Sequence, residues 1–177
     1  MIYTQHYDSP LGGILLAADD VGLTGLRFDG QKYFARGLSN ERIAQETSVL
    51  TEAKRWLDIY FAGKEPDFTP PLHPIGSAFR RSVWEILLQI PYGQTATYGE
   101  IARQLAKKQG LERMSAQAVG GAVGHNEISI IIPCHRVVGA DGSLTGYAGG
   151  IGKKEKLLEL ERADMSRFFV PKKGTAL

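Results

Sequence analysis

The stretch Ile128-Ser-Ile-Ile-Ile-Pro-Cys-His-Arg-Val-Val138 is the part of this chain that most constrains its fold and its chemistry. Its run of β-branched apolar residues predicts a buried strand, and Pro133, which cannot donate a ladder hydrogen bond, should end that strand. The chain's single cysteine, Cys134, then lies directly before a histidine and an arginine. Neighbouring positive charge favours the nucleophilic thiolate, whereas a buried cysteine without such neighbours is usually an inert packing residue. The stretch therefore favours a nucleophile, with a packing role as the alternative.

The relation of Cys134 to His135 constrains the backbone. In a regular strand these two side chains would face opposite sides and could not pair directly. Either the backbone bends at this point, or the histidine acts through an intermediary such as water.

Three helices are predicted upstream of this stretch. Ser77 is expected to cap a helix that ends at Pro91, and its apolar face comprises Phe79, Val83, Leu87 and Ile90. Thr97-Tyr-Gly-Glu100 has the spacing of a capping box, which predicts a helix from Tyr98 to about Lys108. Ser115 should start a short helix of small residues. Two short helices around a glycine-containing turn suggest a helix-turn-helix, although any small helical domain contains such pairs.

The first part of the chain has a different pattern. Ile2–Tyr7, Gly13–Ala18 and Val21–Phe28 read as a small antiparallel sheet, and an amphipathic helix from Thr51 should cover it. Four prolines between Pro66 and Gly76 mark a linker. We therefore expect a two-domain α/β protein: an N-terminal domain of sheet plus helix, residues 1–75, and a mostly helical, winged-helix-like C-terminal domain, residues 76–177.

Composition limits the class of protein. Among the 177 residues, 43% are hydrophobic and 23% charged, as in a globular chain, and no apolar run approaches the roughly 20 residues of a membrane span. One cysteine excludes an internal disulfide and a cysteine-based zinc site, and together with the absence of a signal peptide this predicts a cytoplasmic protein. Residues 1–75 carry a net charge of −3 and residues 76–177 one of +5. The basic C-terminal half suits a polyanion such as DNA, although a solvated surface would show the same excess.

The order of these motifs resembles the O6-alkylguanine-DNA alkyltransferases, also called methylated-DNA-protein-cysteine methyltransferases. Pro133 to Val138 resembles the active-site signature of that family, and the similarity runs from about Phe79 to Glu161, becoming looser over the first 75 residues. The other matching motifs are Val83-Trp84, Ile90-Pro-Tyr-Gly93, Thr97-Tyr-Gly-Glu-Ile-Ala102, Ala118-Val-Gly120, Asn126 and Gly146-Tyr-Ala-Gly-Gly150.

The resemblance implies DNA repair in a single displacement. The thiolate of Cys134 would take an alkyl group from O6 of guanine in double-stranded DNA, with O4-alkylthymine as an open second substrate. The resulting thioether would be permanent, so each molecule, expected to be a monomer, would act once. No metal and no organic cofactor would take part.

The resemblance also implies a proton relay. His135 would accept the proton of Cys134 through a water, and Glu161 would orient the imidazole. Glu161 follows Leu157 and Leu158 at helical spacing, so its carboxylate should point inward, where it is costly unless paired. The alternative is a glutamate at the boundary of the buried helix face, whose carboxylate reaches water.

Four further residues match substrate contacts of the family. Tyr98 matches a tyrosine that donates to the flipped guanine, and Tyr147 with the backbone of Ala148 matches the wall of the alkyl pocket. Val138 would present backbone to the base edge. The structural alternatives are a tyrosine that anchors the helix start and an aromatic residue of a hairpin.

Three further polar residues belong to the candidate site. Asn126 matches the asparagine at the hinge between the recognition helix and the active-site strand, where side-chain amides brace turns. Lys154 would either touch substrate or be a solvated lysine in the first turn of the last helix. Arg136 is grouped with the substrate- and DNA-binding residues, and it is expected to brace the structure and to take no part in the chemistry.

Two positions depart from the family pattern. Gln117 stands where the family often has an arginine that fills the gap left by the flipped nucleotide; glutamine has no charge and stacks less well, which puts efficient extrusion in doubt. Glu127 stands where proline is usual, so the hinge is expected to be less rigid, and its charge would not favour a nearby phosphate.

Two other classes of function are compatible with these residues. Relatives that recognise alkylated DNA without transferring the group lack the motif cysteine, which this chain has. A cysteine hydrolase using Cys134, His135 and Glu161 is not excluded by spacing, but it would regenerate its thiol, whereas an alkyltransferase would not.

Overall fold

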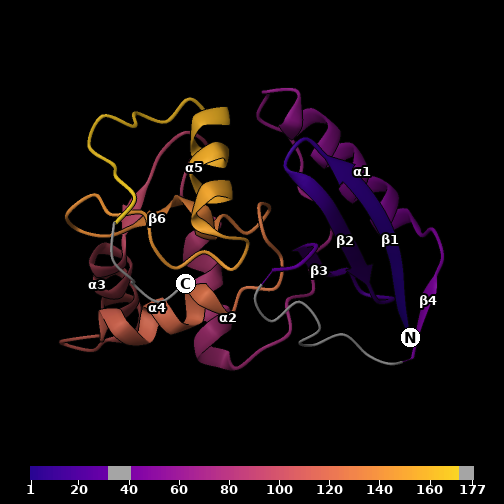
Figure 1. Ribbon diagram of the computed structural model, residues 1–177. Helices are drawn as coiled ribbons and strands as arrows, with labels where there is room; N and C mark the ends of the chain where they lie inside the picture. The colour runs from indigo at the N-terminus through magenta and orange to yellow at the C-terminus, as the bar shows by residue number, and fades with distance from the viewer. Residues whose placement is uncertain (32–40, 172–177) are drawn as a thin grey trace. The chain divides into compact units, whose positions relative to one another are not determined.

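The computed structural model describes residues 1–31 and 41–171. These divide into two compact units. The first unit contains Met1–Ile75 and also Glu127–Ile131, and the second contains Gly76–Asn126 and Ile132 onward. Strands and one helix form the first unit and mainly helices form the second, in agreement with the predicted α/β class (Figure 1).

The first unit is a four-stranded sheet with one helix. Its strand order is β3-β2-β1-β4, in which β1 (Ile2–Ser9), β2 (Gly12–Ala18) and β3 (Leu23–Phe28) form an antiparallel meander. The predicted three strands are thus present. The short strand β4 (Arg42–Ala44) pairs parallel with β1 and was not predicted, because its three residues are exposed and lack an apolar pattern.

Helix α1 (Ser48–Phe61) lies along the sheet of this unit (Figure 1). Thr47 caps it by accepting a hydrogen bond from the Leu50 backbone. Its inward face carries Leu50, Ala53, Trp56, Leu57 and Tyr60, all buried. Burying this apolar stripe against the sheet stabilises both elements, as expected for a helix that covers a small sheet.

In the second unit the predicted caps are confirmed. Ser77, Thr97 and Ser115 each accept a backbone hydrogen bond at the start of a helix. The helices that they cap are α2 (Ala78–Leu87), α3 (Tyr98–Gln109) and α4 (Ala116–Gly124). Gly110 ends α3 in the left-handed conformation at φ 70°, which glycine adopts without steric cost.

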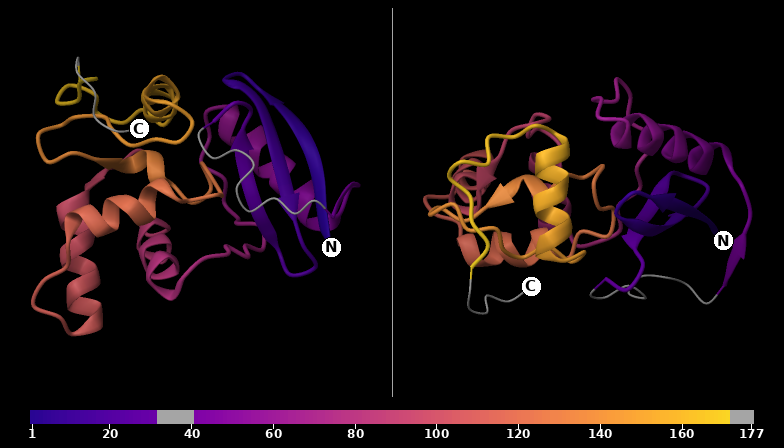
Figure 2. Two further views of the ribbon diagram at one scale, coloured as in Figure 1. Left: turned by 60° about the horizontal axis from the view of Figure 1, so that its bottom comes forward. Right: turned by 45° about the horizontal axis from the view of Figure 1, so that its top comes forward.

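The remaining elements are a 3-10 helix η1 (Cys134–Arg136), two short strands β5 (Ala96–Thr97) and β6 (Val137–Val138), and α5 (Ile151–Leu160). Strand β5 pairs parallel with β6, which joins the start of α3 to the residues that follow the cysteine. In Figure 1 and in the left view of Figure 2, β6 lies between α5 and the cluster of α2, α3 and α4. No helix within the described ranges is long and apolar enough to cross a membrane.

Residues 128–132 do not form the predicted strand. Ile128 makes an isolated bridge to Leu26, and Ser129–Ile131 form a turn in which Ile131 donates to the Ser129 carbonyl at 2.8 Å. A second tight turn follows, because Pro133 has φ −82° and ψ 64° and the Cys134 N–H donates to the Ile132 carbonyl. The bridge at Ile128 and the turn at Pro133 therefore outweigh the strand propensity of these residues. The backbone bends before Cys134, which is one of the two options that the sequence left open.

Candidate active site

Cys134 is the first residue of the 3-10 helix and is 6% exposed. Burial raises the pKa of its thiol, while a hydrogen bond from the Asn126 side chain and the charge of Lys154 act in the opposite direction. Because the net pKa is raised, the thiol is protonated near neutral pH. A nucleophile in this position therefore needs a base nearby to accept its proton.

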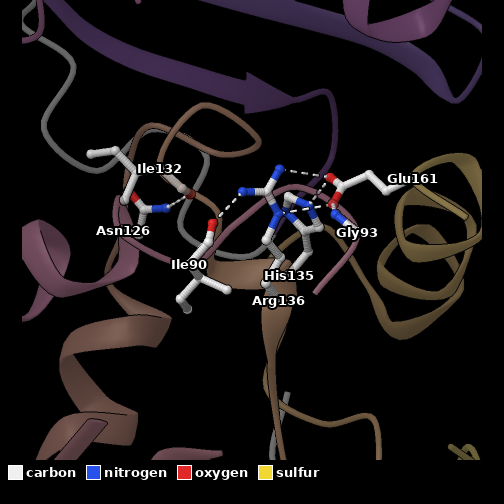
Figure 3. A network of polar contacts seen from close by, with 7 residues as sticks. All are labelled: Ile90, Gly93, Asn126, Ile132, His135, Arg136 and Glu161. Atoms are coloured by element: carbon white, nitrogen blue, oxygen red, sulfur yellow. Dashed lines mark hydrogen bonds and ion pairs between the residues drawn. The ribbon is translucent and has the colours of Figure 1, made fainter. Parts of the chain in front are cut away.

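His135 and Glu161 form a fully buried pair (Figure 3). The His135 Nε2 atom lies 2.6 Å from Glu161 Oε2. Burial lowers the pKa of His135, against the hydrogen bond and the charge of Glu161, which raise it. The imidazole is therefore neutral, and the carboxylate favours the tautomer with the proton on Nε2. His135 Nδ1 makes no hydrogen bond with any residue that the structure describes, so its lone pair can accept a proton.

Glu161 is held by a second side chain and by backbone. Arg136 Nε donates to Oε1 at 2.8 Å and Nη2 donates to Oε2 at 3.1 Å, while the Gly93 N–H donates to Oε1 at 3.0 Å (Figure 3). Burial alone would raise the pKa of Glu161, but the bonds and charges of His135 and Arg136 outweigh it and hold the pKa well below its usual range. A buried carboxylate is stable when it is compensated in this way. The boundary-glutamate alternative is therefore wrong.

Arg136 completes the network by donating from Nη1 to the Ile90 carbonyl at 2.8 Å. This bond connects Arg136, next to His135, with the chain segment that follows α2. The structure therefore places Arg136 inside the second unit, 8% exposed, in the bracing position that the sequence favoured.

Asn126 is buried just after α4, and its amide donates to the Ile132 carbonyl at 2.9 Å. Its side chain also forms the hydrogen bond that lowers the pKa of the Cys134 thiol. One amide thus contacts both Ile132, the residue that follows the segment 127–131, and the cysteine.

Tyr98 and Lys154 converge on one backbone carbonyl. Tyr98 Oη donates to the Thr145 carbonyl at 3.2 Å, and Lys154 Nζ donates to the same oxygen at 2.6 Å and to the Val137 carbonyl at 2.5 Å. Lys154 is fully buried, so of the two alternatives for this residue the solvated lysine is wrong. Burial lowers its pKa to about 8, partly opposed by the charge of Cys134. Burial also raises the pKa of Tyr98, so its phenol keeps its proton.

Tyr147 lies edge-on to His135, with ring centroids 6.5 Å apart and an interplanar angle of 83°, and is buried. Val138 is buried in β6, and Ala148 is half-buried on the loop before α5. Gln117 stands apart from this cluster, because it is exposed near the start of α4. Glu127 contacts Arg27 of the first unit, with Arg27 Nη2 3.3 Å from Oε2.

Several groups at the site were not predicted because they act through backbone atoms. Gly93, Ile90 and Thr145 contribute an N–H or a carbonyl, and backbone groups leave no side-chain signal in a sequence. Gly93 has φ 78°, and a Cβ there would lie 3.0 Å from the Glu161 carbonyl oxygen, so a glycine is required on both counts. Arg27 was also missed, since its burial depends on contacts far along the chain.

Two family models match the chain. "6-O-methylguanine DNA methyltransferase, DNA binding domain" matches residues 78–163, and "6-O-methylguanine DNA methyltransferase, ribonuclease-like domain" matches residues 2–74. Together they account for both parts of the chain.

Relatives with curated names match along nearly their whole length. The methylated-DNA–protein-cysteine methyltransferase of Mycobacterium tuberculosis is 44% identical over 172 residues, covering 95% of this chain and 99% of the relative. The protein of that name from Methanosarcina acetivorans is 44% identical, covering 90% and 98%. The crystal structure of M. tuberculosis OGT in complex with DNA is 42% identical, covers 94% of both chains and superposes with a TM-score of 0.78. On this evidence the chain belongs to the methylated-DNA–protein-cysteine methyltransferase family, the O6-alkylguanine-DNA alkyltransferases.

Proposed function

We propose that this chain repairs DNA by transferring a methyl or larger alkyl group from O6 of guanine to the sulfur of its own Cys134. The environment of the thiol supports Cys134 as the acceptor. Cys134 is the chain's only cysteine, and it is followed by a neutral, buried histidine that is paired with a carboxylate. The family membership of the chain supports the reaction class.

The proton of the thiol passes to His135 Nδ1 through a water. Glu161 holds the imidazole in the tautomer with the proton on Nε2, and its charge stabilises the imidazolium that forms. Arg136 and Gly93 hold the carboxylate in place. The raised pKa of the thiol explains why a base is required instead of a preformed thiolate.

The displacement transfers the alkyl group in a single step. A bond forms between Cys134 Sγ and the alkyl carbon, the bond from that carbon to O6 breaks, and its electron pair stays on the guanine. Tyr98 keeps its phenolic proton because its pKa is raised, so it is a suitable donor to the negatively charged base. Overall the thiol proton replaces the alkyl group on the guanine. The thioether is stable, so one protein molecule repairs one lesion.

Recognition of DNA falls to the second unit. Helices α3 and α4 form the helix-turn-helix pair, and the exposed residues of α4 are small apart from Gln117. A surface of alanine and glycine permits close approach to the minor groove, and Gln117 fills the gap left by the flipped nucleotide. Tyr147 and Ala148 wall the alkyl pocket, and Val138 presents backbone to the base.

We assign residues 76–177 as the DNA-binding alkyltransferase domain and residues 1–75 as a supporting domain. The cytoplasm is the natural compartment, since an acceptor thiol must stay reduced.

Intact-protein mass spectrometry tests the proposal. After mixing with excess duplex containing O6-methylguanine, the protein should gain one methyl group per molecule, mapped to Cys134. The Cys134→Ala variant should gain none yet still bind the duplex. An unchanged wild-type mass with salt-sensitive binding to the lesion would instead indicate a recognition protein, and turnover of an ester with an unmodified thiol would indicate a hydrolase.

A further inference from the structure

The segment Glu127–Ile131 leaves the second unit and belongs to the first. It connects α4 to the active-site 3-10 helix, so its flanking residues, Asn126 and Ile132, both lie in the second unit. The Asn126 amide closes the base of this excursion by donating to the Ile132 carbonyl. The five residues between are packed with the N-terminal sheet.

Strand β3 binds this segment along its open edge. Leu26 donates its N–H to the Glu127 carbonyl at 2.9 Å and accepts from the Ser129 N–H at 3.0 Å, which makes the parallel bridge to Ile128. All six residues of β3 are buried, although the strand is last in the order of the sheet. The segment therefore covers this edge at Leu26, while Leu23 pairs with residues 71–73, and backbone groups that would otherwise be unpaired are satisfied.

A buried ion pair adds to this backbone pairing. Arg27 follows Leu26 in β3, is 2% exposed, and lies with Nη2 3.3 Å from Glu127 Oε2, whose side chain is 23% exposed. The guanidinium lies over Gly25, where a Cβ would overlap it, so the strand leaves room for this side chain. Burial lowers the pKa of Arg27, and the charge of Glu127 acts against that shift. Glu127 thus compensates a charge that is costly to bury.

The bound segment also carries backbone strain. Ile130 has φ 70° and is 1% exposed, in the turn closed by the hydrogen bond from Ile131 to Ser129. A β-branched residue rarely adopts positive φ, and such a conformation persists only where its surroundings enforce it. The strained residue lies four positions before the cysteine. Loss of the contacts that hold it would let the segment relax and would shift the start of the active-site turn.

We propose that Arg27 and Glu127 are positioning residues for the Cys134 site, fastening the segment 127–131 to β3 so that the turn at Pro133 presents the thiol in its reactive placement. Glu127, at a position where the family usually has proline, then has a defined task. The inference rests on the alkyl transfer to Cys134 proposed above, and it gives the N-terminal sheet a part in that reaction.

The first test needs no DNA. Amide hydrogen exchange of peptides spanning 127–134 is compared in wild type, Arg27→Met, Glu127→Gln and the double variant. The matched control is the more exposed pair of Lys54 and Glu46 in the same unit, whose side chains are 28% and 46% exposed and lie 2.7 Å apart. This pair is removed as Lys54→Met and Glu46→Gln. Exchange of the segment should rise about 10-fold in both single variants at Arg27 and Glu127 and stay unchanged in the controls. Equal exchange in wild type and both variants would overturn the proposal.

The second test separates positioning from stability. Single-turnover transfer is measured with saturating O6-methylguanine duplex at a temperature where every variant is folded, and duplex affinity is measured in a Cys134→Ala background. The transfer rate should fall about 10-fold in each single variant, with Kd nearly unchanged, and the double variant should be no slower than the slower single one. The proposal would be refuted if the rate losses of the two single variants multiplied in the double variant, or if the transfer rates simply followed the fraction of folded protein. Failure of wild type to transfer would refute the proposed function, while the exchange result would still decide whether the pair holds the segment.

Discussion

The Glu161→Gln substitution tests the relay most directly, because glutamine keeps the shape of the side chain and removes one acceptor. Glu161 Oε1 accepts from Arg136 Nε and the Gly93 N–H, so the glutamine oxygen belongs there. The amide nitrogen must then replace Oε2, facing Arg136 Nη2 and His135 Nε2. The amide nitrogen cannot accept a hydrogen bond from either of them, so His135 must move its proton to Nδ1 and accept at Nε2.

This change of tautomer should lower the transfer rate, and the substitution should also lower the free energy of unfolding. Transfer should slow by about 100- to 10,000-fold, the range for removing general-base catalysis, because the lone pair that receives the thiol proton is then occupied. The free energy of unfolding should fall by about 3 kcal/mol, the lower end of the range for breaking a buried ion pair, since two hydrogen bonds to the glutamine oxygen remain.

The pH dependence should change as well. The pKa of Glu161 in the folded protein lies below its ordinary value of 4.5, so its contribution to stability is complete above that value and is lost as pH falls toward the folded pKa. Acid destabilisation of wild type below about pH 5 should therefore be weaker in Glu161→Gln.

Single-turnover transfer of labelled methyl from duplex DNA gives the rate, and urea denaturation between pH 3 and 7 gives the free energy of unfolding. Glu159→Gln is the matched control, because Glu159 is an exposed glutamate on the same helix. It should change stability by less than about 0.5 kcal/mol. A folded Glu161→Gln variant that transfers within about 2-fold of wild type would show that Glu161 does not set the tautomer of His135.

Three further predictions concern single side chains. Tyr98→Phe should slow transfer by roughly 10- to 100-fold without changing duplex affinity, because a donor to the leaving base is removed; equal rates at saturating DNA would exclude that role. Gln117→Arg should tighten binding to the lesion-containing duplex and steepen its salt dependence by about one unit of slope in a titration of log K against log salt, whereas an unchanged slope would place this residue away from the DNA. Lys154→Met should remove a rise in stability with pH: the folded pKa is about 8 against an ordinary 10.5, so the unfolded chain binds more protons between these values and wild type should gain free energy of unfolding across that window. If urea denaturation gave the same change in the free energy of unfolding from pH 8 to 10 for wild type and Lys154→Met, the prediction would be contradicted.

Local signals determined most of the elements. Ser77, Thr97 and Ser115 were recognisable as caps because each accepts a hydrogen bond from a backbone group only three residues away. The inward placement of Glu161 also followed from local spacing, since helical periodicity puts it on the face of Leu157 and Leu158. Cys134 could be proposed as the acceptor from its immediate neighbours and from the resemblance of this stretch to the family signature.

Only the tertiary structure decided the rest, because the deciding contacts join residues far apart in the chain. The stretch 128–132 has the composition of a strand, yet pairing with Leu26 across about a hundred residues turns it instead into a strained loop. The same holds for Lys154, whose two carbonyl partners bury a side chain that sequence alone would leave in water. For Glu127 the sequence predicted only a less rigid hinge, whereas in the folded chain its carboxylate lies beside the guanidinium of Arg27. Residue type and spacing specify caps, helix faces and the nucleophile, but burial and pairing of charge depend on partners that only the folded chain brings together.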